Sequence, residues 1–343
     1  MQDSELGPRA SLSQALGEQL CAVFNLGVLD HASDLGGTYN LNALLVTSAG
    51  RYVGRVYRPW VSAERLKSIQ QVRRSLVQQG LPIPQPLATS SGETRATIEG
   101  RLIEIEPYVT HDAIADTWER YAKAFTFLGT LHDALAGSVP PQFVPPRVSN
   151  YGLPSQLLQG VRHTRDVLEK ENALPAVAQA LTACQEAQDL LLVIDAWWKQ
   201  ASSSLPVQLL HGDYGGGNIL LQNENIVAIL DFDFLAVHER VFELAYTSYW
   251  TLKRLELGIS PTGFSWDKLA NLLSLYNHAT SRPLTAQEWA ALPLEMARVP
   301  LYWFAEAGFT PQPLKAVQAM IPSLSFARWL LDHADGVSRQ LSL

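Results

Sequence analysis

The chain has 343 residues, of which 47% are apolar and 17% charged, a composition typical of a folded protein with two domains or one bilobal unit. Its formal net charge is −7 and no basic stretch offsets it, which argues against a nucleic-acid partner. The most apolar run, residues 190–198, is too short to cross a bilayer, so no membrane association is expected.

Cysteine usage points to a reducing compartment. Cys21 and Cys184 lie far apart in the sequence and form neither a disulfide framework nor a zinc-binding spacing. Residues 1–14 lack the basic start and the apolar run of a signal peptide. Both observations predict a cytoplasmic protein, and the sequence leaves its oligomeric state open.

The first part of the chain is expected to form an antiparallel sheet with one main helix against it. Residues 41–58 and 96–109 read as two hairpins. Between them, apolar residues recur at helical spacing from Leu66 to Leu76, and Gly80 ends that helix.

The later part of the chain reads as mainly helical. Asp116 and Glu119 form a helix start signal, and an apolar helical face then continues to Gly137. The remainder is expected to be helical as well, apart from one short β-like insert at residues 219–232.

This change in character predicts a boundary between two lobes near residues 108–112. We assign residues 1–108 to an N-terminal lobe built around the sheet, and residues 109–343 to a mostly helical C-terminal lobe. The predicted fold class is therefore α+β.

The most informative segment is LLHGDYGGGNILLQNENIVAILDFDF, residues 209–234. Asp213 and Asn218 are five residues apart, and Asp231 follows thirteen residues later. Phosphoryl transfer requires a carboxylate that orients an attacking hydroxyl and accepts its proton, together with oxygen ligands that hold magnesium on the phosphates. A loop with the carboxylate and one ligand, followed by a hairpin that delivers the second ligand, meets both requirements. The alternative interpretation is a glycine-rich polar turn followed by a buried strand.

The same five-residue step occurs in the protein-kinase pattern H-R-D-x-x-x-x-N followed by D-F-G. HGDYGGGNIL and AILDFDF resemble the catalytic motif of the aminoglycoside phosphotransferase superfamily, which are small-molecule kinases with a protein-kinase-like bilobal fold. The resemblance implies that Asp213 is the catalytic carboxylate, that Asn218 and Asp231 bind Mg²⁺, and that ATP or GTP is the phosphoryl donor. Weaker matches extend the resemblance over roughly residues 30–310.

A glycine pair marks the start of the N-lobe match. Gly36 and Gly37 precede TYNLN and GRYVGRVY, which resemble the N-lobe run of the homoserine kinase branch. A turn of this kind lets backbone amides approach phosphates, because glycine has no Cβ. The alternative is a glycine-rich turn that leads into a hairpin and binds nothing.

The chain departs from the superfamily at one ion pair. Many members pair a lysine on the third strand with a glutamate on the N-lobe helix, and the matching positions here are Arg55 and Gln70. Arg55 is expected to contact the nucleotide phosphates, in a less firmly fixed orientation unless Glu64 substitutes for the missing glutamate. The alternative is that Arg55 is a solvated strand residue.

The segment from Glu106 to Val109 lies where the superfamily binds the nucleotide base through its backbone. Pro107 has no N–H, which leaves the carbonyl of Glu106 and the amide of Tyr108 or Val109 as partners for the base. This assignment comes from position alone, since a backbone contact leaves no side-chain signature.

Three further polar residues of the matched motifs receive supporting roles. His211 is expected to brace the catalytic loop rather than to act as a general base. His132 is expected to pack and hydrogen-bond between helices. Asp233 either contacts a second metal ion or caps the turn that follows Asp231.

The acceptor site is the least defined part of the sequence. Glu295 and Trp303 lie along a segment that resembles the helix closing the acceptor pocket in the homoserine kinase branch, and Pro300 is expected to kink it. Tryptophans are frequent in the C-terminal half. They suit an aromatic cage for an amine, although core packing is their commoner use.

The predicted activity is ATP-dependent transfer of the γ-phosphoryl group to a hydroxyl of a small metabolite or antibiotic. Homoserine-like and amino-alcohol acceptors rank first and aminoglycosides second. The competing interpretation is a nucleotide-binding pseudokinase that regulates a partner protein, which Arg55 and Gln70 keep open. Retention of Asp213, Asn218 and Asp231 argues against it. A protein kinase is not supported, because no A-P-E-like anchor ends an activation segment.

Overall fold

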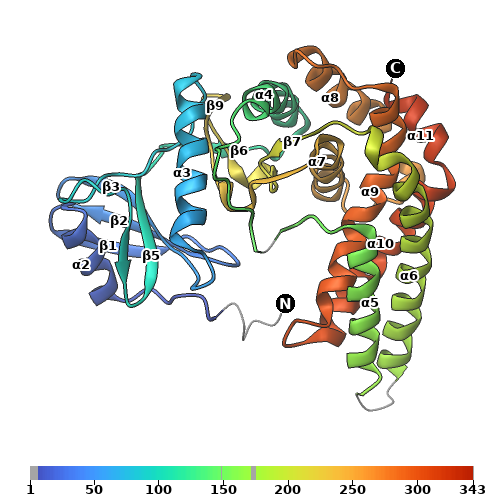
Figure 1. Ribbon diagram of the computed structural model, residues 1–343, viewed down its shortest axis with the longest axis horizontal. Coiled ribbons are helices and arrows are strands. Elements are labelled where there is room, and N and C mark those ends of the chain that lie inside the picture. The colour runs from blue at the N-terminus through green and yellow to red at the C-terminus, as the bar shows by residue number, and fades with distance from the viewer. Residues whose placement is uncertain (1–6, 148, 171–174, 343) are drawn as a thin grey trace.

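The structure is a computed structural model that describes residues 7–147, 149–170 and 175–342. An antiparallel sheet forms one lobe, at the left of Figure 1, and a larger helical lobe lies at the right. The predicted α+β class is thereby confirmed. Within the described residues, no helix is both long enough and apolar enough to cross a membrane.

The N-terminal sheet has five strands in the order β1-β2-β3-β5-β4, and all neighbouring strands are antiparallel. Both predicted hairpins are present. The second turns at Glu99 and Gly100, whose φ angles of 51° and 74° are those of a two-residue hairpin turn. The strands are β1 (Leu29–Asp34), β2 (Leu41–Thr47), β3 (Gly50–Val56), β4 (Ala96–Ile98) and β5 (Arg101–Pro107).

One face of this sheet is covered by a helix that we did not predict, α2 (Gln14–Val23). Leu20 of α2 and Leu45 of β2 are both fully buried in the core of this lobe. Successive side chains of a strand point to opposite faces, so Val53 and Arg55 of β3 face away from α2. The second face of the sheet is therefore free to form the wall of a cleft.

The predicted main helix is α3 (Ala63–Gln78), which lies between the sheet and the helical lobe in Figure 1. Its first turn is capped by the Ser62 side chain, which accepts a hydrogen bond from the Arg65 amide at 3.1 Å. The buried residues Ile69, Val72 and Leu76 belong to the hydrophobic core of the C-terminal lobe. The helix therefore joins the two lobes.

The C-terminal lobe is mostly helical, as predicted. Its first helix, α4, ends before Gly137 as expected, but its N-cap is Thr117 rather than Asp116, because the Thr117 hydroxyl accepts from the Arg120 amide. The helices are α4 (Trp118–Ala136), α5 (Pro154–Leu168), α6 (Pro175–Ala201), α7 (Arg240–Leu255), α8 (Trp266–Ala279), α9 (Ala286–Ala307), α10 (Pro313–Asp332) and α11 (Ala334–Leu341).

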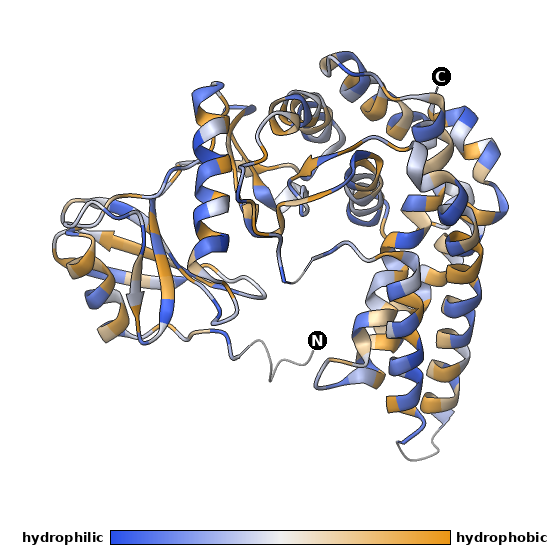
Figure 2. Cartoon of the chain, in the orientation of Figure 1, coloured by the Kyte–Doolittle hydropathy of each residue, from blue (hydrophilic) through white to orange (hydrophobic). Residues whose placement is uncertain are grey.

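Helix α9 is the centre of this bundle and packs against α5, α7 and α10. It contains Pro293 and Pro300 and continues through both, from Ala286 to Ala307. In Figure 2 the helices at the right carry orange and blue residues on different sides, the pattern of amphipathic helices around a shared core.

Short strands hold the loop between the lobes. The predicted insert forms β8 (Ile219–Gln222) and β9 (Asn225–Ile229), which pair with each other, and β8 also pairs with β6 (Ala113–Ile114). A second pair, β7 (Val207–Leu210) with β10 (Ala236–Glu239), was not predicted. Residues 211–218 follow β7 directly, so two small sheets fix the ends of the loop that carries Asp213. The exact lobe boundary, at residues 108–109, stays our prediction.

Candidate active site

A cleft of about 550 Å³ separates the two lobes. Gly36, Gly37 and Arg55 line it from the N-terminal sheet, and Asn218 and Asp231 line it from the C-terminal lobe. The structure therefore brings the predicted glycine turn and the two predicted metal ligands to one cavity.

A smaller chamber of about 190 Å³ adjoins this cleft, and Asp213 lines it. Four residues line both cavities: Gly37, Asn42, Arg55 and Asp231. The two spaces therefore meet at the predicted metal ligand Asp231, with Asp213 on the side of the smaller chamber.

The predicted catalytic loop, residues 211–218, is anchored by one buried carboxylate, Glu243 of α7. It accepts hydrogen bonds from the backbone amides of His211 at 3.1 Å and Gly212 at 2.5 Å, and His132 Nε2 lies 2.8 Å away. Burial of a carboxylate is tolerated when several donors satisfy it. Glu243 therefore ties α7, α4 and the start of the loop together.

His211 braces the loop, as predicted. Its Nε2 lies 2.9 Å from the carbonyl of Leu230, and its Nδ1 accepts from the amide of Asp213 at 3.2 Å. Burial lowers the pKa of His211, which favours the neutral ring that this pair of contacts requires.

Two glycines in this loop are required by close backbone contacts. Gly212 has φ of +84°, and a Cβ there would lie 2.2 Å from the carbonyl oxygen of Phe234. At Gly216 a Cβ would lie 2.0 Å from the carbonyl oxygen of Ala115. Both distances are shorter than any van der Waals contact, so the loop can be built only with glycine at these positions.

The Asp213 carboxylate is held by three side chains. Tyr246 Oη donates to Oδ1 at 2.6 Å, Asn150 Nδ2 donates to Oδ1 at 3.2 Å, and Asn218 Nδ2 donates to Oδ2 at 3.3 Å. Burial, and secondarily the charge of Asp231, raise the pKa of Asp213 to about 7. A carboxyl with such a pKa can accept a proton near neutral pH.

Asn218 and Asp231 have the chemistry that a Mg²⁺ ion requires. Asp231 Oδ1 is buried and, apart from the Arg55 guanidinium 3.1 Å away, meets no donor among the described residues. The same part of the chain contains no cluster of three His, Cys, Asp or Glu side chains arranged for a metal. Magnesium often binds one or two protein oxygens, with phosphates and water completing its shell, so this pair fits the ion.

Arg55 lies between the acidic side chains of the site. Its guanidinium is 3.1 Å from Asp231 Oδ1 and 3.2 Å from Asp233 Oδ1, and its Nε donates to Asn42 Oδ1 at 3.1 Å. Arg55 is therefore not a solvated strand residue. Glu64 does not substitute as its acidic partner, because Glu64 is exposed on the first turn of α3.

Helix α3 is joined to the sheet by an ion pair whose charges are reversed relative to the strand lysine and helix glutamate of the superfamily. Gln70 donates to Glu104 Oε2 at 2.9 Å, and Arg73, one turn later on α3, binds Glu104 at 2.8 Å and also contacts Glu106. The helix here supplies the cation and strand β5 the carboxylates. The Glu106 side chain is thus an ion-pair partner that lines the cleft.

The backbone at the end of β5 differs in detail from our expectation. The Tyr108 amide donates to the Arg51 carbonyl at 3.0 Å, so Val109 supplies the amide that remains for a base. In an antiparallel ladder, hydrogen-bonded residue pairs recur at every second position. Glu106 is paired with Val53, two residues before the Tyr108–Arg51 pair, so the amide and the carbonyl of Glu106 bond to strand β3. The carbonyl directed away from β3 is that of Pro107. The assignments to the Glu106 carbonyl and the Tyr108 amide are corrected accordingly.

The two predicted acceptor residues have different outcomes. Trp303 lines the smaller chamber and also an adjoining groove of about 950 Å³. Glu295 is fully buried, pairs with Arg298 at 2.5 Å, and does not belong to the lining of the cleft, the smaller chamber or this groove. Its assignment as a substrate contact is therefore corrected to a structural ion pair of α9.

Three residues near the site were missed by sequence reasoning: Arg73, Asn150 and Tyr246. Arg73 follows Gln70 by three residues and lies on the same helix face, which is a usable signal. Tyr246 follows Glu243 by the same step on α7. Asn150 lies in a proline-rich connection, where no local pattern identifies a contact with Asp213.

The raised pKa of Asp213 predicts a pH-dependent stability. An unfolded aspartate titrates near pH ~3.9, whereas the folded side chain titrates at about 7. The folded state therefore binds this proton more tightly, and stability is lost as the pH rises from the lower value to the higher. Asp213→Asn is always neutral. We expect its melting temperature to exceed that of the wild type by on the order of 2–5 °C at pH 8 and less at pH 5.

The measurement is thermal unfolding in metal-free buffer across that range. Asp30→Asn, at an exposed position of β1, serves as the control and should show no such pH-dependent difference. A difference between Asp213→Asn and the wild type that does not change with pH would contradict the prediction.

The position of Arg55 predicts a response to divalent cations. In Arg55→Ala the carboxylates of Asp231 and Asp233 lose their shared cation and repel each other. We expect a lower melting temperature without metal and a larger stabilisation by Mg²⁺ alone than in the wild type. Arg9→Ala, which breaks an exposed pair with Asp34, is the control. Equal stabilisation of all three proteins by Mg²⁺ would show that Arg55 does not compensate these carboxylates.

Comparison with known proteins agrees with this geometry. The model of the phosphotransferase enzyme family, APH, matches residues 32–263, more than half of the chain. Homoserine kinase of Caulobacter sp. is 26% identical over 309 residues, covering 88% of each chain. Homoserine kinase of Beijerinckia indica is 27% identical over 263 residues, covering 75% of this chain and 73% of its own.

Solved structures share the fold. A microcompartment-associated aminopropanol kinase superimposes with a TM-score of 0.71 at 16% identity, covering 96% of this chain and all of its own. Amicoumacin kinase hAmiN, solved in complex with AMP-PNP, Ca²⁺ and Ami, gives a TM-score of 0.67 at 13% identity over 92% of this chain and 93% of its own. The chain therefore belongs to the phosphotransferase enzyme family, as a small-molecule kinase with a hydroxyl acceptor and the protein-kinase-like fold that its motifs predict.

Proposed function

We propose that this protein transfers the γ-phosphoryl group of ATP to a hydroxyl of a small hydroxylated amine, such as a homoserine-like amino acid or an amino alcohol. The observation that carries the proposal is the arrangement of the two cavities. Asn218 and Asp231 line the larger cleft, Asp213 lines the smaller chamber, and Asp231 borders both. A donor in the cleft and an acceptor in the chamber would meet between these residues.

The chemistry follows from the residues at this junction. Asp213 orients the acceptor hydroxyl in line with the γ-phosphorus and accepts its proton as the new oxygen–phosphorus bond forms. The bond from that phosphorus to the β–γ bridging oxygen breaks, and ADP leaves. A Mg²⁺ ion held by Asn218 and Asp231 would neutralise charge on the phosphates.

The lining of the smaller chamber favours an amine. Asp213, Asp231 and Asp233 contribute three carboxylates and Arg55 a single cation. Its aromatic walls add faces that attract cations: Tyr39, Trp60, Phe234, Tyr246 and Trp303. A volume of about 190 Å³ suits a small amino alcohol better than a multi-ring aminoglycoside, which would have to extend into the adjoining groove.

The end of β5 supports ATP over GTP. The Pro107 carbonyl and the Val109 amide offer one acceptor and one donor, two residues apart, beside the cleft. Adenine presents a matching donor and acceptor, its exocyclic amine and N1. Guanine presents the reverse pair, O6 and N1–H, so it would leave both backbone groups unpaired.

The acceptor class can be tested with matched pairs of alcohols. We expect homoserine or 1-aminopropan-2-ol to stimulate ADP release with Mg-ATP, whereas 2-aminobutyrate and propylamine, which lack the hydroxyl, should not. Asp213→Asn should lower kcat by about 10²–10⁴ while the dissociation constant of Mg-ATP stays near the wild-type value. Stimulation by the hydroxyl-free controls, or phosphorylation of proteins alone across the panel, would refute the proposal.

The donor preference can be tested by calorimetry with Mg-nucleotides. We expect ATP to bind at least about tenfold more tightly than GTP, because two mismatched backbone groups cost more than one ordinary hydrogen bond. Inosine triphosphate is the control, since it has O6 and N1–H but no 2-amino group. If inosine triphosphate binds as tightly as ATP, the backbone pair does not select the base.

A further inference from the structure

The Asp213 carboxylate is held unequally at its two oxygens. Oδ1 receives hydrogen bonds from Tyr246 at 2.6 Å and Asn150 at 3.2 Å, both from outside the catalytic loop. From the residues that the structure describes, Oδ2 receives only the longer contact of 3.3 Å from Asn218, a residue of the same loop. A carboxylate fixed at one oxygen has a defined orientation, and its second oxygen remains available.

Both donors to Oδ1 are themselves fixed. Tyr246 and Asn150 are 7% and 8% exposed, and Asn150 Nδ2 also lies 3.3 Å from Tyr246 Oη and 3.2 Å from the Gly212 carbonyl. Tyr246 belongs to α7, three residues after Glu243, the anchor of the loop backbone. One helix thus holds both the backbone of the loop and its carboxylate.

The two residues that follow Asn150 are held by contacts to the C-terminal lobe. Arg298 of α9 donates to the Gly152 carbonyl at 2.8 Å, and its guanidinium lies 4.6 Å from the centre of the Tyr151 ring. Tyr151 Oη donates to Glu239 Oε2 at 2.6 Å. Asn150 is therefore followed by two residues that the C-terminal lobe holds in place, although the segment itself is an irregular connection.

We propose that Tyr246 and Asn150 are positioning residues that grip Oδ1 of Asp213 and so present Oδ2 to the acceptor hydroxyl. The inference rests on the proposed role of Asp213 as the carboxylate that receives the acceptor proton. A carboxylate free to rotate would offer the correct oxygen only part of the time. The two hydrogen bonds to Oδ1 therefore increase the rate of phosphoryl transfer and leave nucleotide binding unchanged.

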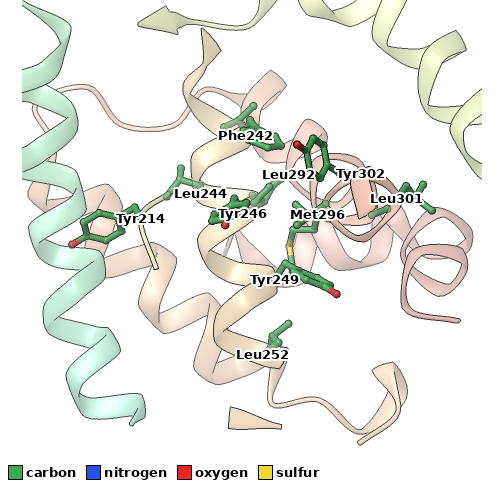
Figure 3. Packing of buried hydrophobic residues seen from close by; sticks show 14 of the residues in the cluster. Tyr214, Phe242, Leu244, Tyr246, Tyr249, Leu252, Leu292, Met296, Leu301 and Tyr302 are labelled. Carbon is green, nitrogen blue, oxygen red and sulfur yellow. The ribbon is translucent and has the colours of Figure 1, made fainter. Parts of the chain in front are cut away.

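The test compares two tyrosines of the same helix. Figure 3 shows Tyr246 and Tyr249 on neighbouring turns of α7. Tyr249 is 3% exposed, and its hydroxyl lies 3.3 Å from Ser323 Oγ, so Tyr249→Phe also removes a buried hydroxyl, but one remote from Asp213. We expect Tyr246→Phe to lower kcat by about 10- to 100-fold, the effect of one hydrogen bond to a charged group, and Tyr249→Phe to change it less than about twofold.

The accompanying constants separate positioning from other roles. With 1-aminopropan-2-ol as acceptor, or with water if no alcohol stimulates ADP release, the Mg-ATP dissociation constant and the melting temperature of Tyr246→Phe should match those of Tyr249→Phe. In the Asp213→Asn background, Tyr246→Phe should have no further effect on kcat, because the gripped group has already lost its function. If Tyr246→Phe does not fold, Asn150→Ala replaces it in each measurement.

Four results would overturn the inference: an unchanged kcat in Tyr246→Phe, an equal loss in Tyr249→Phe, a rise confined to the acceptor KM, or an undiminished effect in the Asp213→Asn background. The proposed function fails separately, when Asp213→Asn alone keeps its kcat. The single aspartate variant therefore reports on the catalytic assignment, and the tyrosine pair reports on the grip.

Discussion

The constraint on which the rest of the site depends is the accumulation of negative charge where the lobes meet. Asp213, Asp231 and Asp233 line one small chamber, and Arg55 is the cation that contacts two of them. In a partly buried space such charges repel strongly unless each is compensated. Arg55 compensates Asp231 and Asp233, and hydrogen bonds hold Asp213. A nucleotide adds further negative charge, so donor binding and metal binding are expected to be tightly coupled here.

The carboxylate of Glu243 connects the loop that carries Asp213 to the helical lobe. Because it accepts from two successive backbone amides of the loop and contacts His132, the loop cannot shift without breaking contacts to α4 and α7 together. Loss of this carboxylate would leave buried donors unpaired, which costs more than a hydrogen bond contributes. The same helix carries Tyr246, so the charge cluster and the hydrophobic core share one rigid support.

The sequence allowed the local parts of this design to be predicted, because their signals are local. Both hairpins of the N-lobe, the loop with Asp213 and Asn218, and the position of Asp231 after the next hairpin follow from spacing and glycine content. Helix α2 was missed although Ser13 caps it and Leu20 lies on its buried face, whereas the polar strand β1, LDHASD, has no alternating pattern to find. Asn150 could not be predicted, because its contact with Asp213 joins residues 63 positions apart.

The partner of Arg55 shows why charge pairing is harder to predict than fold. Family resemblance suggested a strand cation that binds a helix carboxylate, and Gln70 breaks that pattern. The structure instead joins helix α3 to a different strand, β5, with the signs exchanged, through Arg73 of α3 and Glu104 of β5. The position opposite Arg55 in the sheet is Glu104, whose charge is already paired with Arg73. Arg55 therefore pairs with the carboxylates of the C-terminal lobe. The change of ion-pair polarity within the N-lobe thus directs Arg55 to Asp231, a predicted metal ligand.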